Sequence, residues 1–323
     1  MRFAILFPGQ GSQKVGMGLD LFEQTKFAKE IFNLINQTAN RNISDIFLTG
    51  SQEELNQTKN TQISLVAVST ALTQILQENL KSKKLDFKPF ACCGHSLGEL
   101  TCLWYTEIVS LKEVVELVLL RGNLMQEAPI GRMAAVLNIE NSKISKLIKE
   151  NDLSNDVVIA NFNSPTQFVL SGNKDAINSL IPKFKLLGGK AIILPLSGAF
   201  HSPLMNKPAE IFSAQIDKLL NQSRKNAKIP IYQNLDGEPS TDSKTILEKL
   251  RKQMISPVLW TQTINNLVND NVRAFIEIGP GKVLTGLVKK INPEVECYNI
   301  FDLESLNNFV ENYECKFLST KNI

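Results

Sequence analysis

A serine stands between two glycines in the pentapeptide GHSLG, residues 94–98. A serine hydroxyl becomes a strong nucleophile when a base takes its proton, and a sharp turn between a strand and a helix can present it to a substrate. The apolar run FKPFACC (87–93) predicts a buried strand directly before Gly94, and LGELTCLWY (97–105) predicts a helix directly after Ser96. The pattern therefore predicts a nucleophile elbow with Ser96 at its tip.

The base for this serine is most often a histidine, and the chain has two, His95 and His201. His95 is the immediate neighbour of Ser96. Side chains of neighbours on a sharp turn point apart, so we expect His95 to pack behind the turn. The segment SGAFHSPLM (197–205) holds the other histidine, and His201 is therefore predicted to be the general base.

A third group usually orients the histidine of such a pair. Three aspartates that could do so, Asp152, Asp156 and Asp175, lie in the interval between the serine and His201. All three fall in a segment that we expect to form a separate subdomain. A carbonyl oxygen can hold an imidazole instead, so a serine–histidine dyad without a carboxylate is an open alternative.

Acyl transfer passes through an oxyanion, which two N–H groups commonly stabilise. The N–H of Leu97, the residue after the serine, is a natural first donor. The loop FPGQGSQ (7–13) is the best source of the second, because it follows the first predicted strand and its glycines let the backbone approach closely. A simple turn is the alternative. A phosphate-binding loop is disfavoured, because GQGSQK (9–14) fits neither phosphate-loop pattern.

Arg121 is the charge whose position is most informative. Its neighbours one helical turn away are all apolar: Leu117, Val118, Leu124 and Met125. A guanidinium on a buried helix face is costly unless a carboxylate pairs with it. The partner is either a carboxylate of the protein or a carboxylate of the ligand, held in a bidentate clamp.

The elements that would position these residues alternate between strands and helices, which indicates an α/β fold with a parallel sheet. The segments predicted as strands of the main sheet are 2–7, 87–93, 228–235 and 272–279, and those predicted as helices around it are 19–38, 62–80, 97–105, 110–128 and 281–291. Residues 302–313 have helical spacing at the end of the chain.

Between these halves lies a segment with an order of its own. It reads strand (132–139), helix (141–151), strand (156–162), strand (166–172), helix (173–189, with a kink at Pro182) and strand (190–196). This βαββαβ order is the ferredoxin-like pattern. We therefore expect a small subdomain of residues 131–196 inserted into a large α/β hydrolase-like subdomain of residues 1–130 and 197–323.

Composition excludes several classes of protein. Hydrophobic residues make up 43% and charged residues 21% of the 323 residues, the balance of a globular protein with a substantial core. The net charge of +3 is too small to indicate a nucleic-acid partner. No apolar run is long enough to span a membrane, and no signal peptide is visible. The five cysteines lack zinc-ligand spacing, so we expect free thiols, no metal and a cytoplasmic protein.

The chain resembles the malonyl-CoA:acyl carrier protein transacylase family, including stand-alone acyltransferases of polyketide synthases. The resemblance covers residues 3 to about 291. It rests, in the family's order, on FPGQGSQ, GHSLGE, RGNLMQEA, ANFNSPTQFVLSG, GAFHSPLM, SPVLW and EIGPGKVLTGL. One departure is the segment LWYTEIVSL (103–111), where the bulky or charged Trp104, Tyr105 and Glu107 replace small residues, and we expect altered packing of the elbow helix there.

The resemblance implies a role for each site residue. Ser96 carries the acyl group as an ester and His201 is the general base. The backbone N–H groups of Gln10 and Leu97 form the oxyanion hole, and Arg121 grips the free carboxylate of malonyl.

It also implies three roles around this centre. Gln253 orients His201 through a carbonyl, and Asn161 lies near the cleft between the subdomains. Phe200, in an AFHS-type segment, favours malonyl over methylmalonyl.

The function that the resemblance implies is a ping-pong transfer of malonyl from malonyl-CoA to the phosphopantetheine thiol of an acyl carrier protein, for fatty acid or polyketide synthesis. We expect a monomer with no permanently bound cofactor. The alternatives are an acyl hydrolase of the same fold, a non-catalytic docking protein for carrier proteins, and a generic esterase. An intact set of Ser96, His201 and Arg121 disfavours the docking protein, and the missing acid disfavours the esterase.

Overall fold

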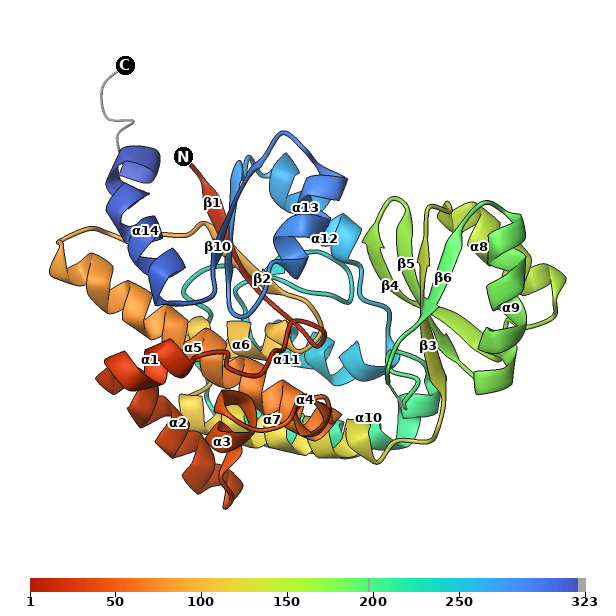
Figure 1. The fold of residues 1–323 in the computed structure, drawn as a ribbon, viewed down its shortest axis with the longest axis horizontal. Helices are drawn as coiled ribbons and strands as arrows, with labels where there is room; N and C mark the ends of the chain where they lie inside the picture. Colours follow the sequence, from red (N-terminus) through yellow and green to blue (C-terminus); the bar gives the residue numbers. More distant parts are fainter. Residues whose placement is uncertain (197, 319–323) are drawn as a thin grey trace.

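The computed structural model describes residues 1–196 and 198–318 of the chain. Two sheets organise it, and Figure 1 shows the small sheet beside the larger body of the molecule. The large sheet has the strand order β10-β9-β1-β2-β7-β8, and its pairs are parallel except for β7 with β8. Its strands are β1 (Phe3–Phe7), β2 (Ala91–Gly94), β7 (Ile231–Tyr232), β8 (Pro239–Ser240), β9 (Ala274–Ile278) and β10 (Glu296–Ile300).

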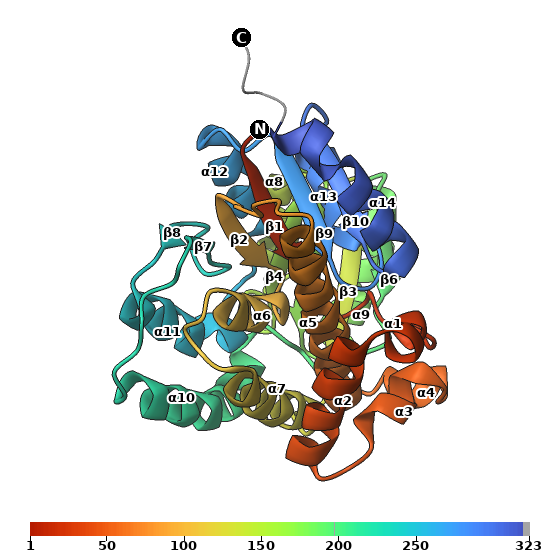
Figure 2. The same ribbon diagram turned by 90° about the vertical axis from the view of Figure 1, so that its left-hand side faces the viewer.

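The central strands are almost entirely apolar, with Glu277 of β9 as an exception, because helices cover both faces of this sheet. Every residue of β1 is buried, and the same holds for β9. Phe3, Ile5 and Phe7 join one core cluster, while Ala4 and Leu6 join another on the opposite face. In Figure 2, α12 and α13 lie at the top beside β1 and β2, and α2, α7 and α10 lie at the bottom.

The helices of the larger body are numerous, and most contribute to one of these two clusters. They are α1 (Leu19–Gln24), α2 (Lys26–Ala39), α3 (Ile43–Leu48), α4 (Gln52–Leu55), α5 (Thr58–Ser82), α6 (Gly98–Tyr105), α7 (Leu111–Gln126), α10 (Asn206–Leu220), α11 (Ser243–Lys252), α12 (Trp260–Asn269), α13 (Val283–Ile291) and α14 (Leu303–Tyr313). Three short turns, Pro203–Met205, Gln253–Ile255 and Glu314–Leu318, complete the helical structure.

The small sheet has the βαββαβ order that the sequence predicts. Its strands β3 (Arg132–Leu137), β4 (Val157–Ser164), β5 (Gln167–Gly172) and β6 (Lys190–Ile193) are all antiparallel, in the order β4-β5-β3-β6. The helices α8 (Asn141–Glu150) and α9 (Lys174–Leu186) contribute to its own core with Val136, Phe168 and Leu170. The expected α/β fold with a second, small sheet is confirmed, while the exact subdomain limits stay a prediction.

Several elements of the larger body differ from the expectations. The helix expected at 19–38 is two helices, because Thr25 is extended and its side chain caps α2 by accepting a hydrogen bond from the N–H of Ala28. The strands β8 and β10 and the helices α3, α4, α10, α11 and α12 were not expected. The helical spacing of residues 302–313 agrees with α14, which Asp302 caps.

Candidate active site

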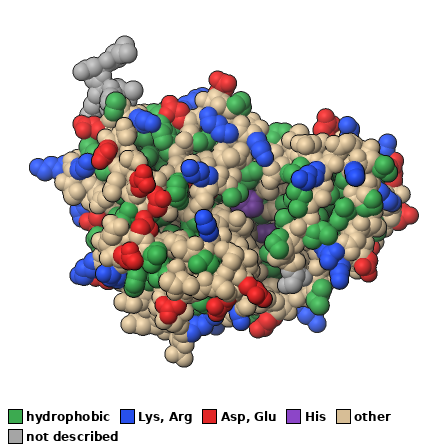
Figure 3. All heavy atoms as spheres, in the orientation of Figure 1, with side chains coloured by type: hydrophobic (Ala, Val, Ile, Leu, Met, Phe, Trp, Pro, Cys, Tyr) green, Lys and Arg blue, Asp and Glu red, His purple; other side chains and the backbone are tan. Residues whose placement is uncertain are grey.

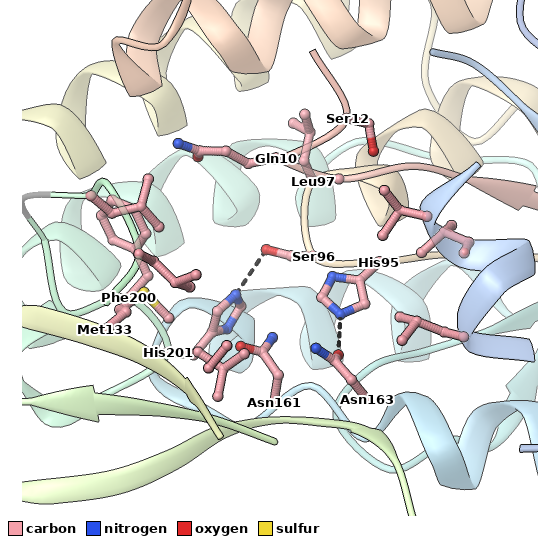
Figure 4. Close-up of a pocket in the computed structure, with 18 of the residues that line it drawn as sticks. Gln10, Ser12, His95, Ser96, Leu97, Met133, Asn161, Asn163, Phe200 and His201 are labelled. Atoms are coloured by element: carbon pink, nitrogen blue, oxygen red, sulfur yellow. Dashed lines mark hydrogen bonds between the residues drawn. The ribbon is translucent and has the colours of Figure 1, made fainter. Parts of the chain in front are cut away.

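A pocket opens between the two sheets, and the predicted site residues gather there. Its polar lining includes Ser96, Arg121, Asn161 and His201, and its apolar lining comes from β3, β5, α7, α13 and the residues Leu194, Leu196 and Phe200. Figure 3 shows histidine side chains at the bottom of a hollow between the larger body and the small-sheet part. Figure 4 shows the labelled residues of this pocket from close by.

The nucleophile elbow is built as the sequence predicts, with β2 ending at Gly94 and α6 beginning at Gly98. Ser96 has a φ of 50°, in the left-handed region that a serine rarely adopts. Both glycines are needed for close approach. A Cβ on Gly94 would lie 2.0 Å from the carbonyl carbon of Gly98, and a Cβ on Gly98 would lie 2.1 Å from the carbonyl oxygen of Phe7.

The hydroxyl of Ser96 and the imidazole of His201 form the pair that the sequence predicts. Ser96 Oγ lies 2.8 Å from His201 Nε2 (Figure 4). His201 Nδ1 lies 3.0 Å from the carbonyl oxygens of Gln253 and Ser256. Since carbonyl oxygens can only accept, Nδ1 carries the proton and Nε2 is free to accept one from the serine.

The structure therefore has the carbonyl arrangement that the sequence left open, and no aspartate of the described residues makes a hydrogen bond or ion pair with His201. Burial, followed by the positive charge of Arg121, lowers the pKa of His201 to about 3. The imidazole is thus neutral at physiological pH, which is the form that can take a proton.

His95 turns away from the serine hydroxyl. Its Nε2 lies 2.8 Å from Asn163 Oδ1 (Figure 4). The centre of its ring lies 5.5 Å from that of Trp260. Burial lowers the pKa of His95, although the hydrogen bond with Asn163 opposes this shift. His95 makes no hydrogen bond with the Ser96 hydroxyl, but it lines the same pocket, so it does not lie behind the turn as expected.

Arg121 projects from α7 into the buried end of the pocket and is 1% exposed. Its guanidinium donates to Gln62 Oε1 at 2.8 Å, to Ser96 Oγ at 2.9 Å and to Gln253 Oε1 at 3.0 Å. No Asp or Glu of the described residues forms an ion pair with it within 4.0 Å, and its Nε has no hydrogen-bond partner among them. An internal carboxylate as direct partner, one of the two alternatives, is therefore not found.

The two expected oxyanion donors line the same pocket from separate loops. Gln10 follows β1 and Leu97 follows the serine, and neither backbone N–H donates to another described residue. The two loops are in tight contact, since a Cβ on Gly9 would lie 2.4 Å from the carbonyl oxygen of His95. The absence of a side chain at Gly9 therefore permits the loop 7–13 to lie against the elbow.

The remaining predicted residues surround this centre. Asn161 on β4 and Phe200 both line the pocket and are almost fully buried. The side chain of Gln253 lies behind the serine and donates to the Ser96 carbonyl oxygen at 2.9 Å. Their contacts are compatible with the implied roles, which stay predictions.

Sequence reasoning missed one residue that touches the elbow directly. Asn234 accepts a hydrogen bond from the N–H of Ser96 at 2.6 Å and donates to the carbonyl oxygen of Gly94 at 2.7 Å. It follows β7, the strand beside β2. The signal was available in principle, because polar residues at the carboxyl ends of adjacent parallel strands meet at one edge of the sheet.

The residues that depart from the family pattern lie elsewhere. The ring of Tyr105 packs 5.7 Å from that of Phe7, and Lys228 Nζ lies 4.7 Å from its centroid and 3.2 Å from Glu107. Trp104, Tyr105 and Glu107 do not line the pocket that holds Ser96. Their effect on acyl selectivity therefore has no direct route through that pocket.

Two kinds of site are absent from the described residues, 1–196 and 198–318. No group of three or more His, Cys, Asp or Glu side chains there could hold a metal ion. No helix in that part of the chain is long and apolar enough to cross a membrane. The five cysteines, all of them described, are free thiols.

Comparison with known proteins identifies relatives along almost the whole chain. Residues 4–300 match the model of the acyl transferase domain. The malonyl CoA-acyl carrier protein transacylase of Staphylococcus aureus (strain MSSA476) is 39% identical over 315 residues, 96% of this chain and 98% of that protein. The protein of the same name from Bacillus subtilis (strain 168) is 38% identical over 310 residues, 94% of this chain and 95% of that protein.

Solved structures agree with this. A malonyl-transacylase in complex with a type II PKS acyl-carrier protein has a TM-score of 0.90 and 32% identity, covering 97% of this chain and 100% of that one. The malonyl CoA-acyl carrier protein transacylase of Coxiella burnetii has a TM-score of 0.89 and 30% identity, covering 96% of this chain and 97% of that one.

Proposed function

This chain belongs to the malonyl CoA-acyl carrier protein transacylase family, and from that membership we propose that it transfers malonyl from malonyl-CoA to the phosphopantetheine thiol of an acyl carrier protein. One observation carries the assignment of the site. The hydroxyl oxygen of Ser96 lies 2.8 Å from a neutral base, His201 Nε2, and 2.9 Å from a buried cation, Arg121. A base activates the nucleophile, and a cation beside it suits an acyl group that ends in a carboxylate.

In the first half-reaction, Ser96 Oγ attacks the thioester carbon of malonyl-CoA while His201 Nε2 takes the hydroxyl proton. The carbonyl oxygen becomes an oxyanion, which the N–H groups of Gln10 and Leu97 stabilise. The carbon–sulfur bond then breaks, and the imidazolium returns its proton to the departing sulfur of CoA. The product is a malonyl ester on Ser96.

In the second half-reaction, the carrier-protein thiol gives its proton to His201 and attacks the ester carbon. The bond to Ser96 Oγ breaks, and the serine regains its proton from the imidazolium. The carbonyl oxygens that hold His201 Nδ1 keep the same ring nitrogen available for both steps. Arg121 binds the free carboxylate throughout, and Phe200 limits the room beside it, which favours malonyl over methylmalonyl.

Three further expectations belong to this proposal and stay predictions: a cytoplasmic location, a monomeric state and the absence of a permanently bound cofactor. The choice between fatty acid and polyketide synthesis depends on the carrier protein that is the natural acceptor. An acyl hydrolase of the same fold would use water in the second half-reaction, and the following experiment separates it from a transacylase.

The experiment is mass spectrometry of the intact protein after incubation with malonyl-CoA. We expect the wild type to gain one malonyl group and then to pass it to added holo carrier protein faster than to water. Ser96→Ala should gain none, because the ester needs the serine oxygen. Labelling of that variant, or release of free malonate without transfer, would contradict the proposal.

A further inference from the structure

Glu99 is a buried carboxylate directly behind the nucleophile, and the mechanism above does not use it. It lies in the first turn of α6, three residues after Ser96, and is 1% exposed. One of its oxygens accepts from the side-chain amide of Gln253, and the other accepts from the backbone N–H of Asn234 at 3.4 Å. A carboxylate so deeply buried is costly, so its presence calls for a reason in the site.

The contacts of Gln253 supply that reason, because they leave its amide one orientation. A guanidinium can only donate, so the amide oxygen must face Arg121, as it does at 3.0 Å. The amide nitrogen must then face groups that accept. It does so with the Glu99 carboxylate and the Ser96 carbonyl oxygen. An ionised Glu99 therefore helps to hold the amide oxygen against the guanidinium.

Glu99 also supplies the negative charge that Arg121 lacks in direct contact. The amide of Gln253 bridges the two buried charges, with its oxygen on the cation and its nitrogen on the anion. Each charge acts on the other through this short bridge: the charge of Glu99 raises the pKa of Arg121, and the charge of Arg121 lowers that of Glu99. The larger cause in each case is burial, which works in the opposite direction.

We propose that Glu99 is a positioning residue that fixes Arg121, through the amide of Gln253, in the orientation that receives the carboxylate of the acyl group. The proposal rests on the proposed function, in which Arg121 grips that carboxylate. The same Gln253 accepts from His201 Nδ1 through its main-chain oxygen. Glu99 therefore lies behind both Arg121 and His201. Its link to Arg121 runs through the side chain of Gln253, whereas its link to His201 runs through the main chain of that residue.

The test compares transfer from malonyl-CoA with transfer from acetyl-CoA, which has no free carboxylate. In Glu99→Gln the charge is removed and one carboxylate oxygen becomes an NH₂ group, so the amide nitrogen of Gln253 no longer faces a carboxylate and its orientation is held less firmly. We expect the ratio of malonyl to acetyl kcat/KM to fall about tenfold, the cost of weakening one hydrogen bond to a buried charge. A folded variant with an unchanged ratio would overturn the proposal.

A matched control is Glu277→Gln. Glu277 on β9 is equally buried, and its carboxylate accepts from the N–H groups of Leu284 and Thr285 at the start of α13. The substitution removes a buried charge and a set of hydrogen bonds without touching Gln253. We expect the melting temperature to fall and transfer from both donors to change together, so that their ratio holds.

The wild type offers a second readout that does not depend on a variant folding. Burial raises the pKa of Glu99 to about 7, against the opposing hydrogen bonds and the charge of Arg121. Protonated Glu99 carries a donor, as Gln does, so the wild-type ratio should fall towards that of Glu99→Gln as pH drops through about 7. The variant's own ratio should be independent of pH, and a merely structural role would give no such convergence.

The neighbours of Glu99 do not titrate in this range. Burial raises the pKa of the thiols of Cys93 on β2 and Cys102 on α6 well above their usual value. Arg121 on α7 keeps its proton, because burial lowers its pKa only to about 10, and His201 is already neutral. A free malonyl carboxylate stays ionised above about pH 5. A flat wild-type ratio between about pH 5.5 and pH 8.5 would therefore overturn the proposal.

Arg121→Ala separates this inference from the function on which it depends. If Arg121→Ala loses the malonyl preference and Glu99→Gln keeps it, the positioning role of Glu99 is wrong and the clamp stands. If Arg121→Ala also keeps the preference, the clamp itself is wrong. Loss of the preference in both variants, with the pH response present in the wild type and absent in Glu99→Gln, supports the whole arrangement.

Discussion

At the scale of single residues, the active site contains residues that a local sequence pattern reveals and residues whose partners lie far away along the chain. Ser96 carries a local signature in its two flanking glycines, and His201 follows from a chain with two histidines. Asn234 and Gln253 act on the same turn from 138 and 157 residues away. No local pattern marks an amide whose partner lies so far along the chain, so Gln253 was named through the family resemblance and Asn234 became visible through the fold.

His201 gives a pH prediction at this scale. Its folded pKa of about 3 lies below the ordinary value of 6.5, so the unfolded chain takes up a proton between these values that the folded protein refuses. The free energy of unfolding should therefore fall as pH drops from 6.5 towards 3, by up to about 1.4 kcal/mol per pH unit from this group. His201→Gln cannot protonate and should lose less stability over the same range.

The measurement is denaturant unfolding of both proteins at several pH values. Glu99, whose raised pKa acts in the opposite direction between about pH 4.5 and 7, is present in both and cancels in the difference. Parallel stability curves would show that the imidazole of His201 is protonated as easily in the folded protein as in the unfolded chain.

At the scale of elements, the sequence predicted the central strands, whose two faces are both buried. The runs that became β1 and β9 are buried on both faces, so apolar residues follow one another, with Glu277 of β9 as the one interruption. The strand β10 pairs along one side, with β9, and is partly exposed, so its sequence ECYNI resembles a loop. The break between α1 and α2 depends on the capping hydrogen bond of Thr25, which a helical apolar pattern does not reveal.

The elbow is the element whose geometry depends most on a distant side chain, and Asn234 supplies a prediction. Its amide holds the N–H of Ser96 and the carbonyl oxygen of Gly94, on either side of the left-handed serine. Asn234→Ala leaves both groups buried without a partner. We expect acylation of Ser96 to slow by about tenfold or more, because the strained turn loses its support.

The measurement is the rate of malonyl-enzyme formation at saturating malonyl-CoA, with the melting temperature recorded beside it. Asn266→Ala is the control, since Asn266 donates to the carbonyl oxygen of Gly237 at 3.0 Å, far along the chain from the elbow. It should lower stability without slowing acylation. Equal rates in the wild type and Asn234→Ala would show that the turn keeps its shape unaided.

At the scale of the whole molecule, the pocket exists because two sheets face each other. The βαββαβ order was readable from the sequence, since each of its elements has its own periodicity. The placement of that sheet was not, because it depends on contacts between distant segments. An isolated bridge joins Asn161 to Val258, and Met133 and Val169 join the core cluster of the larger body.

The insertion itself leads to a prediction about the whole chain. Residues 131–196 contain a core of their own, to which Val136, Phe168 and Phe184 contribute, and their two ends meet where Ile130 bridges to Gly198. A segment with its own core and adjacent ends should fold when it is produced alone. Its free energy of unfolding should be small, about 3 kcal/mol or less, because a chain of this length buries little surface and the face with Met133 and Val169 loses its cover.

Far-ultraviolet circular dichroism and the dispersion of amide resonances of the isolated segment would check this prediction. The segment should not be labelled by malonyl-CoA, since it lacks the serine. A spectrum typical of an unfolded chain would mean that the small sheet needs the larger body to form, and that the pocket is assembled in a single folding step.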